Sequence, residues 1–453
     1  MKRILVMALV ACFVLGAAMA NAETKFSGSF EHSLEWTDNQ DFQEGSADNN
    51  NEEDFTALQR VRLYFEHVTS EDLRAVIGFE FDTTWGAQDS NDEYGGGAIG
   101  SDGGQLEIKH AYTDFKTGPL SWRVGLQGLA FPSSVAGNPI FASDLAGIVT
   151  SYAFNENVSV VAAYARLWDG NNTTTDQADD EIDAAVVLLP ITMDGWNVTP
   201  YAAYAMAGTG SNTTALAFPV IDLTNPSSAV GYTDSVTATW VGAALGVNMF
   251  DPFTFGMDLI YGSVDGDEAE DNDRSGWYFA AIGTYKLDMV TPSLAFIYGT
   301  GDDDDITNGS ETMPTLACGG GAHSGLALTE FGLNGAGGTE SGDILNNSRT
   351  DFMAVALILD DISFLENLKH KFVLVYGKGT SDESNANRAN IMVTEEDSFW
   401  EVNLDSTYAI YENLALNVNM AYLDVDRDED TWTTAGADLD AASKLFVNLT
   451  YKF

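Results

Sequence analysis

The chain has 453 residues, with 68 acidic and 20 basic side chains and a formal net charge of −48 at pH 7. That charge excludes DNA or RNA as a partner, because nucleic-acid binding depends on neutralising phosphates with basic side chains. Aromatic residues make up 11% of the chain and glycine occupies 43 positions, whereas proline occupies only 10. This composition favours many regular strands joined by polar loops over helices.

The N-terminus has the features of a cleaved secretory signal peptide. A short basic region precedes an apolar run from Ile4 to Ala18, and a small-x-small cleavage site ends at Ala22. A lipoprotein signal with lipid on Cys12 is the alternative, but the apolar run continues beyond that cysteine. We expect export through the Sec pathway, removal of residues 1–22 and a mature chain that begins at Glu23. No later stretch approaches the roughly 18 apolar residues of a membrane-spanning helix.

From residue 23 onward, segments of about ten residues alternate between apolar and polar side chains, as strands with one apolar face do. In the last segment one face carries Leu445, Val447, Leu449, Tyr451 and Phe453, and the other carries Lys444, Asn448, Thr450 and Lys452. A terminal phenylalanine that completes the apolar row is typical of outer-membrane barrels. Such segments begin near Lys25, Phe55, Arg74, Gln105, Ser121, Gly147, Val158, Asp180, Asn197, Thr237, Phe253, Ser275, Val290, Thr350, His370, Phe399, Leu414 and Ser443.

The connections between these segments alternate between short and long. Long connections cover about 37–54, 85–104, 131–146, 208–236, 300–349 and 380–398. This alternation is typical of a membrane barrel with short periplasmic turns and long extracellular loops, whereas the Greek-key connections of a soluble sandwich would break it. We therefore predict an all-β fold, a single transmembrane antiparallel up-and-down β-barrel over residues 23–453. About 18 strands are expected, and about 16 is the next choice.

The aromatic residues predict two rings of side chains at the membrane interfaces. One set falls at the long-loop ends of the segments: Trp36, Trp85, Trp168, Trp277 and Trp400. The other falls at the short-turn ends: Trp122, Trp196, Phe250, Tyr451 and Phe453. Amphipathic aromatic rings concentrate at the headgroup level of a bilayer, whereas the aromatic residues of a soluble core need not be sorted in this way.

Two stretches resemble known porins. Residues 108–132, with IKHAYTDFK, GPLSWRVGLQ and Phe131-Pro132, resemble the fourth and fifth strands of trimeric porins, whose next loop folds into the barrel. Residues 364–380, FLENLKHKFVLVYGKGT, resemble the homotrimeric porins of anaerobic sulfate-reducing bacteria. The resemblance implies a homotrimer that supports passive diffusion across the outer membrane of a Gram-negative bacterium, in contact with lipid and lipopolysaccharide. It also implies insertion by the barrel-assembly machinery through a terminal signal at Tyr451 and Phe453.

Strand parity predicts charged side chains on the inner face of the first seven strands. In trimeric porins, arginines at the constriction face acidic residues of the inserted loop, and the resulting field orders water. Here that loop, 131–146, holds a single acid, Asp144, so a weaker field is expected. The alternative is that the arginines pair with acids of the same polar wall. The predicted inner residues are Arg60, Arg62, Glu66, Arg74, Glu80, Asp82, Arg123, Gln127 and Arg166.

Acidic runs lie in the presumed outer loops, at 52–54, 265–273, 302–305 and 424–430. Clustered carboxylates could hold divalent cations, but residues 424–428 lack the glycine and the spaced glutamate of an EF-hand loop. Solvated acidic loops are the other interpretation. In either case, the loops should concentrate cations at the mouth of the barrel.

No arrangement typical of catalysis is present in the sequence. The histidines, at positions 32, 67, 110, 323 and 370, form no pair at metal-binding spacing, and there is no Gly-x-Ser-x-Gly motif. Once Cys12 is removed, Cys318 stands alone, which argues against a disulfide or a thiolate metal site. We expect no enzyme activity, no cofactor and no bound metal.

The sequence therefore predicts a weakly cation-selective trimeric porin that passes small hydrophilic solutes. The closest alternative is a substrate-specific channel for sugars or for an anion such as phosphate. A sugar channel would need aromatic side chains along the lumen, and an anion channel would need a basic constriction. A third possibility is a structural or adhesive barrel whose long loops bind a partner.

Overall fold

The computed structural model describes residues 23–39, 53–87, 97–100, 106–135, 137–169, 181–208, 235–265, 273–305, 308–316, 350–385, 393–432 and 439–453. The expected signal peptide, Cys318, His323 and the acidic residues between positions 266 and 272 lie outside these ranges. None of the described residues forms a helix that is long and apolar enough to cross a membrane. Glu383–Asn385 forms a single 3-10 turn.

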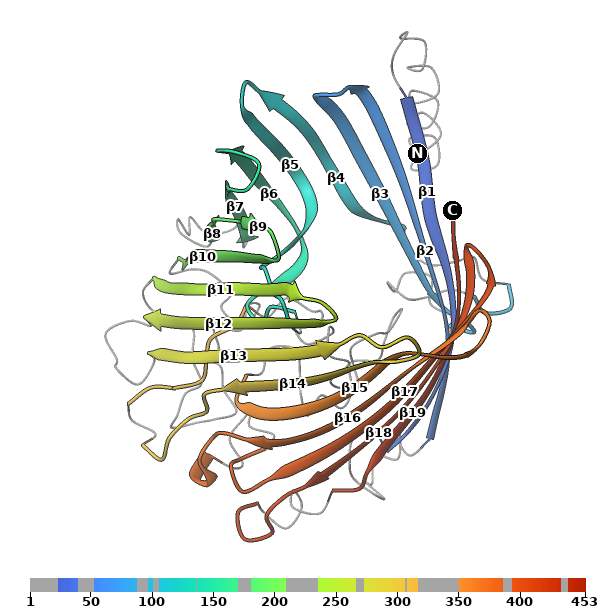
Figure 1. Cartoon of the computed structure of the whole chain (residues 1–453), viewed down its shortest axis with the longest axis vertical. Coiled ribbons are helices and arrows are strands. Elements are labelled where there is room, and N and C mark those ends of the chain that lie inside the picture. Colours follow the sequence, from blue (N-terminus) through green and yellow to red (C-terminus); the bar gives the residue numbers. More distant parts are fainter. Residues whose placement is uncertain are drawn as a thin grey trace.

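Within the described ranges, one antiparallel sheet contains 19 strands. Strands that follow one another in the sequence pair with each other, and β1 pairs with both β2 and β19, so the sheet closes into a barrel. The colours in Figure 1 accordingly run in order around the wall, from blue β1 to red β19 beside it. The strands are β1 (Glu23–Asp38), β2 (Glu53–Ser70), β3 (Leu73–Thr84), β4 (Leu106–Thr117), β5 (Leu120–Ala130), β6 (Ala142–Ala153), β7 (Ser159–Asp169), β8 (Glu181–Leu188), β9 (Ile191–Met193), β10 (Trp196–Ala207), β11 (Val236–Phe250), β12 (Phe253–Asp265), β13 (Arg274–Tyr285), β14 (Thr291–Gly299), β15 (Phe352–Leu365), β16 (Leu368–Gly379), β17 (Ser398–Tyr411), β18 (Leu414–Asp426) and β19 (Ala442–Lys452).

Strands β8 and β9 occupy one position in the wall, because both pair with β10. The interruption falls at Leu189-Pro190, where proline lacks the N–H that a ladder requires. Counting the two together gives 19 − 1 = 18 crossing strands, which confirms the predicted transmembrane antiparallel barrel. The largest difference in a predicted strand start is at β6, which begins at Ala142 rather than Gly147.

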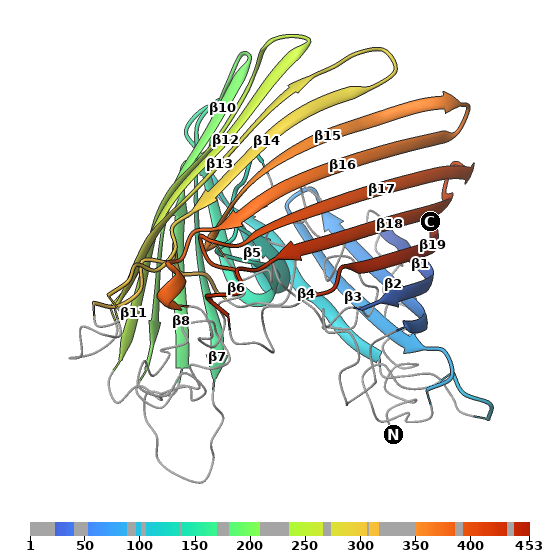
Figure 2. The same cartoon turned by 90° about the horizontal axis from the view of Figure 1, so that it is seen from below.

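The predicted alternation of short and long connections is confirmed. Figure 2 shows the turns β11–β12, β13–β14, β15–β16 and β17–β18 along one rim of the barrel. The chain between β5 and β6, and between β14 and β15, connects strands at the other rim. An up-and-down barrel places its connections at two opposite rims in this way.

Apolar side chains line the outer face of the barrel. On β14, Leu294 and Phe296 are 60% and 37% exposed, whereas Ala295 and Ile297 beside them are each 1% exposed. Since side chains alternate between the faces of a strand, the exposed set faces away from the barrel interior. The tryptophans expected at the long-loop rim are all exposed: Trp36, Trp85, Trp168, Trp277 and Trp400.

The seam between β1 and β19 closes the barrel. Phe453 N donates to Gly28 O at 3.1 Å, and Gly28 N donates to Phe453 O at 3.0 Å. The Phe453 ring lies 5.2 Å from that of Phe26. On the inner side of the seam, Lys444 Nζ lies 3.0 Å from Glu35 Oε2, and both side chains are nearly fully buried. Paired backbone groups, packed rings and an ion pair therefore join the first strand to the last.

The inner face of the barrel changes character around the wall. On β2, β3 and β4 it carries charged side chains that contact one another. From β10 to β16 it is apolar, and Trp240, Ile260, Tyr278 and Val375 are at most 1% exposed. Chain segments that fold inward cover this apolar arc, so the barrel holds a hydrophobic core inside its own wall.

Candidate functional site

A connected group of ion pairs lies on the inner face of β2 and β3. Arg60 on β2 donates to both carboxylate oxygens of Asp82 on β3, at 2.8 and 2.7 Å. Arg62 Nε donates to Glu80 from the next inward position. The strand register produces these pairs, because Arg60 lies opposite Asp82 and Arg62 lies opposite Glu80. Opposite charges placed across an antiparallel ladder attract one another.

Asp114 on β4 joins two further arginines. Its carboxylate accepts from Arg74 Nε at 2.7 Å, and from Arg123 Nε and Nη2 at 2.7 and 2.9 Å. Arg74 also contacts Glu66 on β2 at 3.2 Å. The Arg123 guanidinium lies over the Tyr112 ring, 4.3 Å from its centre. A carboxylate shared between two guanidinium groups holds both in a fixed orientation.

Two neighbouring residues of β4 contact the same carboxylate. The register between β3 and β4 shifts at Gly78, which leaves Lys109 without a direct partner in the ladder. Lys109 Nζ lies 2.7 Å from Asp144 and 3.7 Å from Glu80, and His110 Nε2 lies 3.2 Å from Asp144. Asp144 therefore joins the edge of the charged group, whereas the resemblance to trimeric porins implied an acid facing the arginines across the pore.

These contacts form two neighbouring sets on the same strands, one around Glu80 and one around Asp114, and we call the two together the ion-pair cluster. The contacts include five cations and five carboxylates, so the formal charge is 5 − 5 = 0 with His110 neutral. Fixed charges of both signs hold water and polar solutes without favouring either sign strongly. Removal of one member would leave its partner uncompensated. The cluster consists of Arg60, Arg62, Glu66, Arg74, Glu80, Asp82, Lys109, Asp114, Arg123 and Asp144.

Eight of the residues predicted for the pore wall meet in this cluster, and their contacts agree with the alternative in which the arginines pair within one wall. Sequence reasoning did not single out Asp114 and Lys109. Asp114 lies within the stretch that resembles trimeric porins, and parity on β4 would have faced it toward Arg123. Strand parity alone does not predict where the Lys109 side chain lies, because its position depends on the register shift between β3 and β4. The predicted residues that meet are Arg60, Arg62, Glu66, Arg74, Glu80, Asp82, Arg123 and Asp144.

The structure corrects the predicted inner position of Arg166. On β7 it shares a face with Tyr164 and Trp168, which are 44% and 37% exposed. It donates to Asp183 on β8 at 3.0 and 3.1 Å. Ala165, on the other face of β7, is buried in the inner core. The prediction failed because the inner face is apolar here, so apolar residues do not mark the lipid side.

Strands β4 and β5 diverge from their shared turn (Figure 1). Their pairing ends with Ala111 opposite Leu126. Gly125, directly before that point, has a φ of 128°, and a Cβ there would collide with the Ala111 carbonyl oxygen. Only glycine fits this bend.

The chain between β5 and β6 crosses the inside of the barrel and reaches β12. Asp258 on β12 accepts from Ser133 Oγ at 2.6 Å and from the next two backbone N–H groups at 2.7 and 3.2 Å. Further along, Asn138 donates to the Tyr201 hydroxyl at 2.9 Å. We call residues 131–135 and 137–141 the first inward segment. The resemblance to trimeric porins implied an inserted loop here, and the structure places this segment inside the barrel.

A second inward segment, residues 308–316, lies against the first. Leu316 N donates to Ile140 O at 2.8 Å, which joins the two segments directly. Trp240 Nε1 on β11 donates to Pro314 O at 2.8 Å. The two segments and the wall therefore form one packed unit that narrows the space inside the barrel.

The second inward segment carries one carboxyl group with an altered pKa. Burial raises the pKa of Glu311, and the nearby charges of Asp303 and Asp302 raise it further. The Asp303 N–H donates to Glu311 Oε2 at 3.2 Å, which opposes this increase. Ionisation of Glu311 is therefore disfavoured where the segment packs.

The described residues show no group of three or more histidine, cysteine, aspartate or glutamate side chains that could hold a metal ion. The acidic residues near 302–305 form bonds among themselves and to neighbouring polar groups. Asp302 accepts from Ser310 Oγ at 2.5 Å and from Thr312 Oγ1 at 2.8 Å. These carboxylates stabilise the turn that begins the second inward segment.

Comparisons with solved structures agree with the architecture. OpdK of Pseudomonas aeruginosa, solved with vanillate, aligns over 95% of this chain and 98% of its own, with a TM-score of 0.57 and 10% identity. OpdL of the same organism aligns over 96% and 100%, with a TM-score of 0.54 and 14% identity. OccAB3 of Acinetobacter baumannii aligns over 96% of this chain and 100% of its own, with a TM-score of 0.55 and 10% identity.

No family model matches the chain, and no curated protein matches it significantly. Identities of 10–14% over nearly the whole length establish a shared fold. The chain therefore has the closed β-barrel fold of those bacterial proteins.

Proposed function

We propose that this chain forms an outer-membrane channel through which small solutes diffuse passively, and that its inward segments select among them. The observation that carries the proposal is the contact between the first and the second inward segments inside a closed barrel whose outer face is apolar. An apolar outer face suits lipid, and the inward segments restrict the aqueous path.

A selective channel is favoured over a wide, general diffusion pore. The inward segments fill part of the space that 18 strands would otherwise enclose. The remaining wall is two-sided, with the ion-pair cluster on β2–β6 and mostly apolar side chains from β7 to β16. The similar fold of OpdK, which was solved with vanillate, supports a channel for particular solutes.

The proposal extends to the surroundings of the barrel. The apolar band would contact outer-membrane lipid and lipopolysaccharide of a Gram-negative bacterium. Tyr451 and Phe453 would present the last strand to the barrel-assembly machinery after export. Assembly as a homotrimer, which rests on the resemblance to trimeric porins, can be checked from the mass of the cross-linked protein in native membranes.

The decisive experiment is single-channel recording of the purified mature protein in a planar bilayer under a KCl gradient. A selective channel should show ohmic steps with a cation-biased reversal potential, and particular solutes should interrupt the current. Large steps that no solute interrupts would favour the general diffusion pore. Folded protein that inserts without conducting would contradict both and favour a structural or adhesive barrel.

A further inference from the structure

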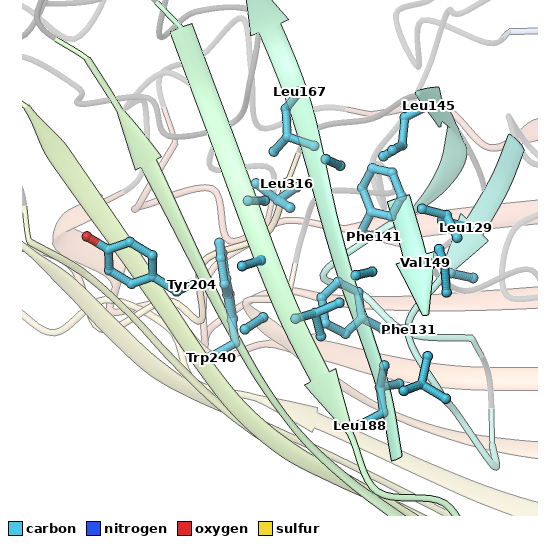
Figure 3. A pocket seen from close by; sticks show the side chains of 18 residues that line it. Leu129, Phe131, Phe141, Leu145, Val149, Leu167, Leu188, Tyr204, Trp240 and Leu316 are labelled. Carbon is cyan, nitrogen blue, oxygen red and sulfur yellow. The ribbon is translucent and has the colours of Figure 1, made fainter. Parts of the chain in front are cut away.

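A cavity of about 220 Å³ lies on the inner face of the barrel wall. Its 18 lining residues come from β5 to β8, from β10 and β11, and from the ends of both inward segments. Figure 3 shows Phe131, Phe141, Leu145 and Leu316 gathered around this space, while Tyr204 points away from it. The cavity is therefore formed where the wall meets the inward segments.

The chemistry of the lining is uniformly apolar. Apart from Tyr204, whose side chain is 47% exposed on the other face of β10, the lining residues are alanine, valine, leucine, phenylalanine and tryptophan. The indole N–H of Trp240 already donates to Pro314 O. A bound group would therefore meet no free hydrogen-bonding side chain, and water would find too few partners to be held there.

The volume limits the size of the occupant. An apolar cavity of roughly 150 Å³ in another protein stays dry and binds benzene. At 220 Å³, this cavity has room for one substituted aromatic ring or a branched aliphatic group. A long alkyl chain would not fit whole.

The ion-pair cluster borders the cavity. Val149, which lines the cavity, lies directly opposite Arg123 in the β5–β6 ladder. Side chains at directly opposed positions share one face of the sheet, about 5 Å apart. An apolar group in the cavity would therefore hold the polar end of the same molecule beside fixed charges of both signs.

We propose that this cavity is a binding site for the aromatic or branched aliphatic group of an amphipathic solute. The inference rests on the proposed channel function for its biological meaning, because a solute inside the barrel would meet this wall. Binding itself depends only on apolar contact: burial of one ring removes apolar surface from water on both sides of the contact.

Neighbouring alanines on opposite faces of β7 provide a matched pair of variants. Ala163 lines the cavity, so Ala163→Phe should fill it. Ala162 faces the other side of the strand, so Ala162→Phe adds the same ring outside the cavity. A third variant, Val149→Thr, keeps the volume and replaces one methyl group by a hydroxyl.

The test measures binding of 4-bromobenzyl alcohol to the mature protein in lipid nanodiscs by saturation-transfer NMR. Wild type and A162F should bind saturably with equal affinity, and A163F should lose about tenfold or more. V149T should bind roughly fourfold more weakly, as loss of one methyl contact implies. Nanodiscs without protein measure partition of the alcohol into lipid. All variants are first checked for folding by electrophoresis without heating.

Equal binding by A163F and A162F would overturn the proposal, as would unchanged binding by V149T if A163F does not fold. In crystals soaked with the same alcohol, an anomalous bromine peak among Phe141, Leu145 and Val149 is expected, and a peak elsewhere would also overturn it. Neither readout requires conduction. A silent barrel that binds would therefore contradict only the channel, and a conducting barrel that does not bind would contradict only this site.

Discussion

At the residue scale, Asp114 is the member of the ion-pair cluster whose loss should have the clearest effect. It is the carboxylate that both Arg74 and Arg123 contact at 2.7 Å. Asp114→Asn should leave an additional positive charge on the inner wall and lower the cation-to-anion permeability ratio by about twofold. The reversal potential in a KCl gradient measures this ratio. Loss of the charged bonds should also cost about 1–3 kcal/mol of folding stability.

Asp72→Asn is the matched control for this substitution. Asp72 pairs with Lys116 at 2.8 Å, but both side chains are more than half exposed at a short turn. An exposed pair contributes little, and it lies outside the narrowed part of the barrel. If D114N and D72N gave the same reversal potential as the wild type, the cluster would not border the conducting path.

The raised pKa of Glu311 predicts that the stability of the folded protein depends on pH. Burial raises its pKa in the folded protein above the value in the unfolded chain. Folding therefore penalises the ionised form: the penalty is absent below the unfolded pKa and grows as the pH rises through the folded pKa. Glu311→Gln should raise the melting temperature at about pH 7, and this gain should vanish at about pH 3. A gain that persisted at the acidic pH would show that ionisation is not the cause.

At the scale of elements, Asp258 holds the first inward segment against β12. It is 2% exposed and accepts three hydrogen bonds from that segment. Bonds to a charged acceptor contribute about 1.5–3 kcal/mol each, so Asp258→Ala should release the segment. We expect larger single-channel conductance and noisier open levels than in the wild type. Asp288→Ala, at the exposed β13–β14 turn, is the control, and equal conductance in the two variants would exclude this role of Asp258.

The strands and the outer face of the barrel are predictable from the sequence, whereas the contacts on its inner face are less so. Period-two patterns and alternating connections gave the strands and both rims, because every lipid-facing position must be apolar. The same rule misplaced Arg166, since β7 is apolar on its inner face as well. Ala203 and Ala205 are buried under inward segments that no local pattern predicts. Which strand a loop will contact across the barrel depends on tertiary packing alone.

The charged site was predictable in part for the same reason. Arg60 and Arg62 alternate with clear outward residues, so parity placed them correctly on the inner face. Lys109 lies at a register shift, and Asp144 lies where β5 and β6 leave the neighbouring strand. No short sequence motif marks either irregularity. The full membership of the cluster therefore depends on how its strands pair, and no single strand predicts it.

At the scale of the whole molecule, Phe453 lies at the seam that closes the barrel. Phe453 exchanges two backbone hydrogen bonds with Gly28 and packs on Phe26 and Tyr451. Phe453→Ala should reduce the fraction of protein that migrates as a compact barrel without heating, because less apolar surface is buried at the seam. Phe364→Ala removes a ring that is 73% exposed at the β15–β16 turn. Equal folded fractions for the two variants would exclude a special role for the terminal ring.

The net charge of the whole chain predicts how ion selectivity depends on the salt concentration. Removal of residues 1–22, which the sequence predicts, would leave 18 basic and 68 acidic residues, a net charge of 18 − 68 = −50. The ion-pair cluster is balanced, so this excess lies elsewhere, including the acidic residues at 302–305 and 424–430. Exposed charges are screened over about 10 Å at 0.1 M salt and about 3 Å at 1 M.

Cation preference that arises from these exposed acids should therefore strengthen as the salt concentration falls from about 1 M to about 0.1 M. Reversal potentials measured at a fixed KCl ratio and several mean concentrations test this dependence. The shift caused by D114N should change less with salt, because Asp114 is partly buried and its field is less screened. A wild-type preference independent of salt would place the selecting charges inside the barrel and contradict the acidic loops as their source.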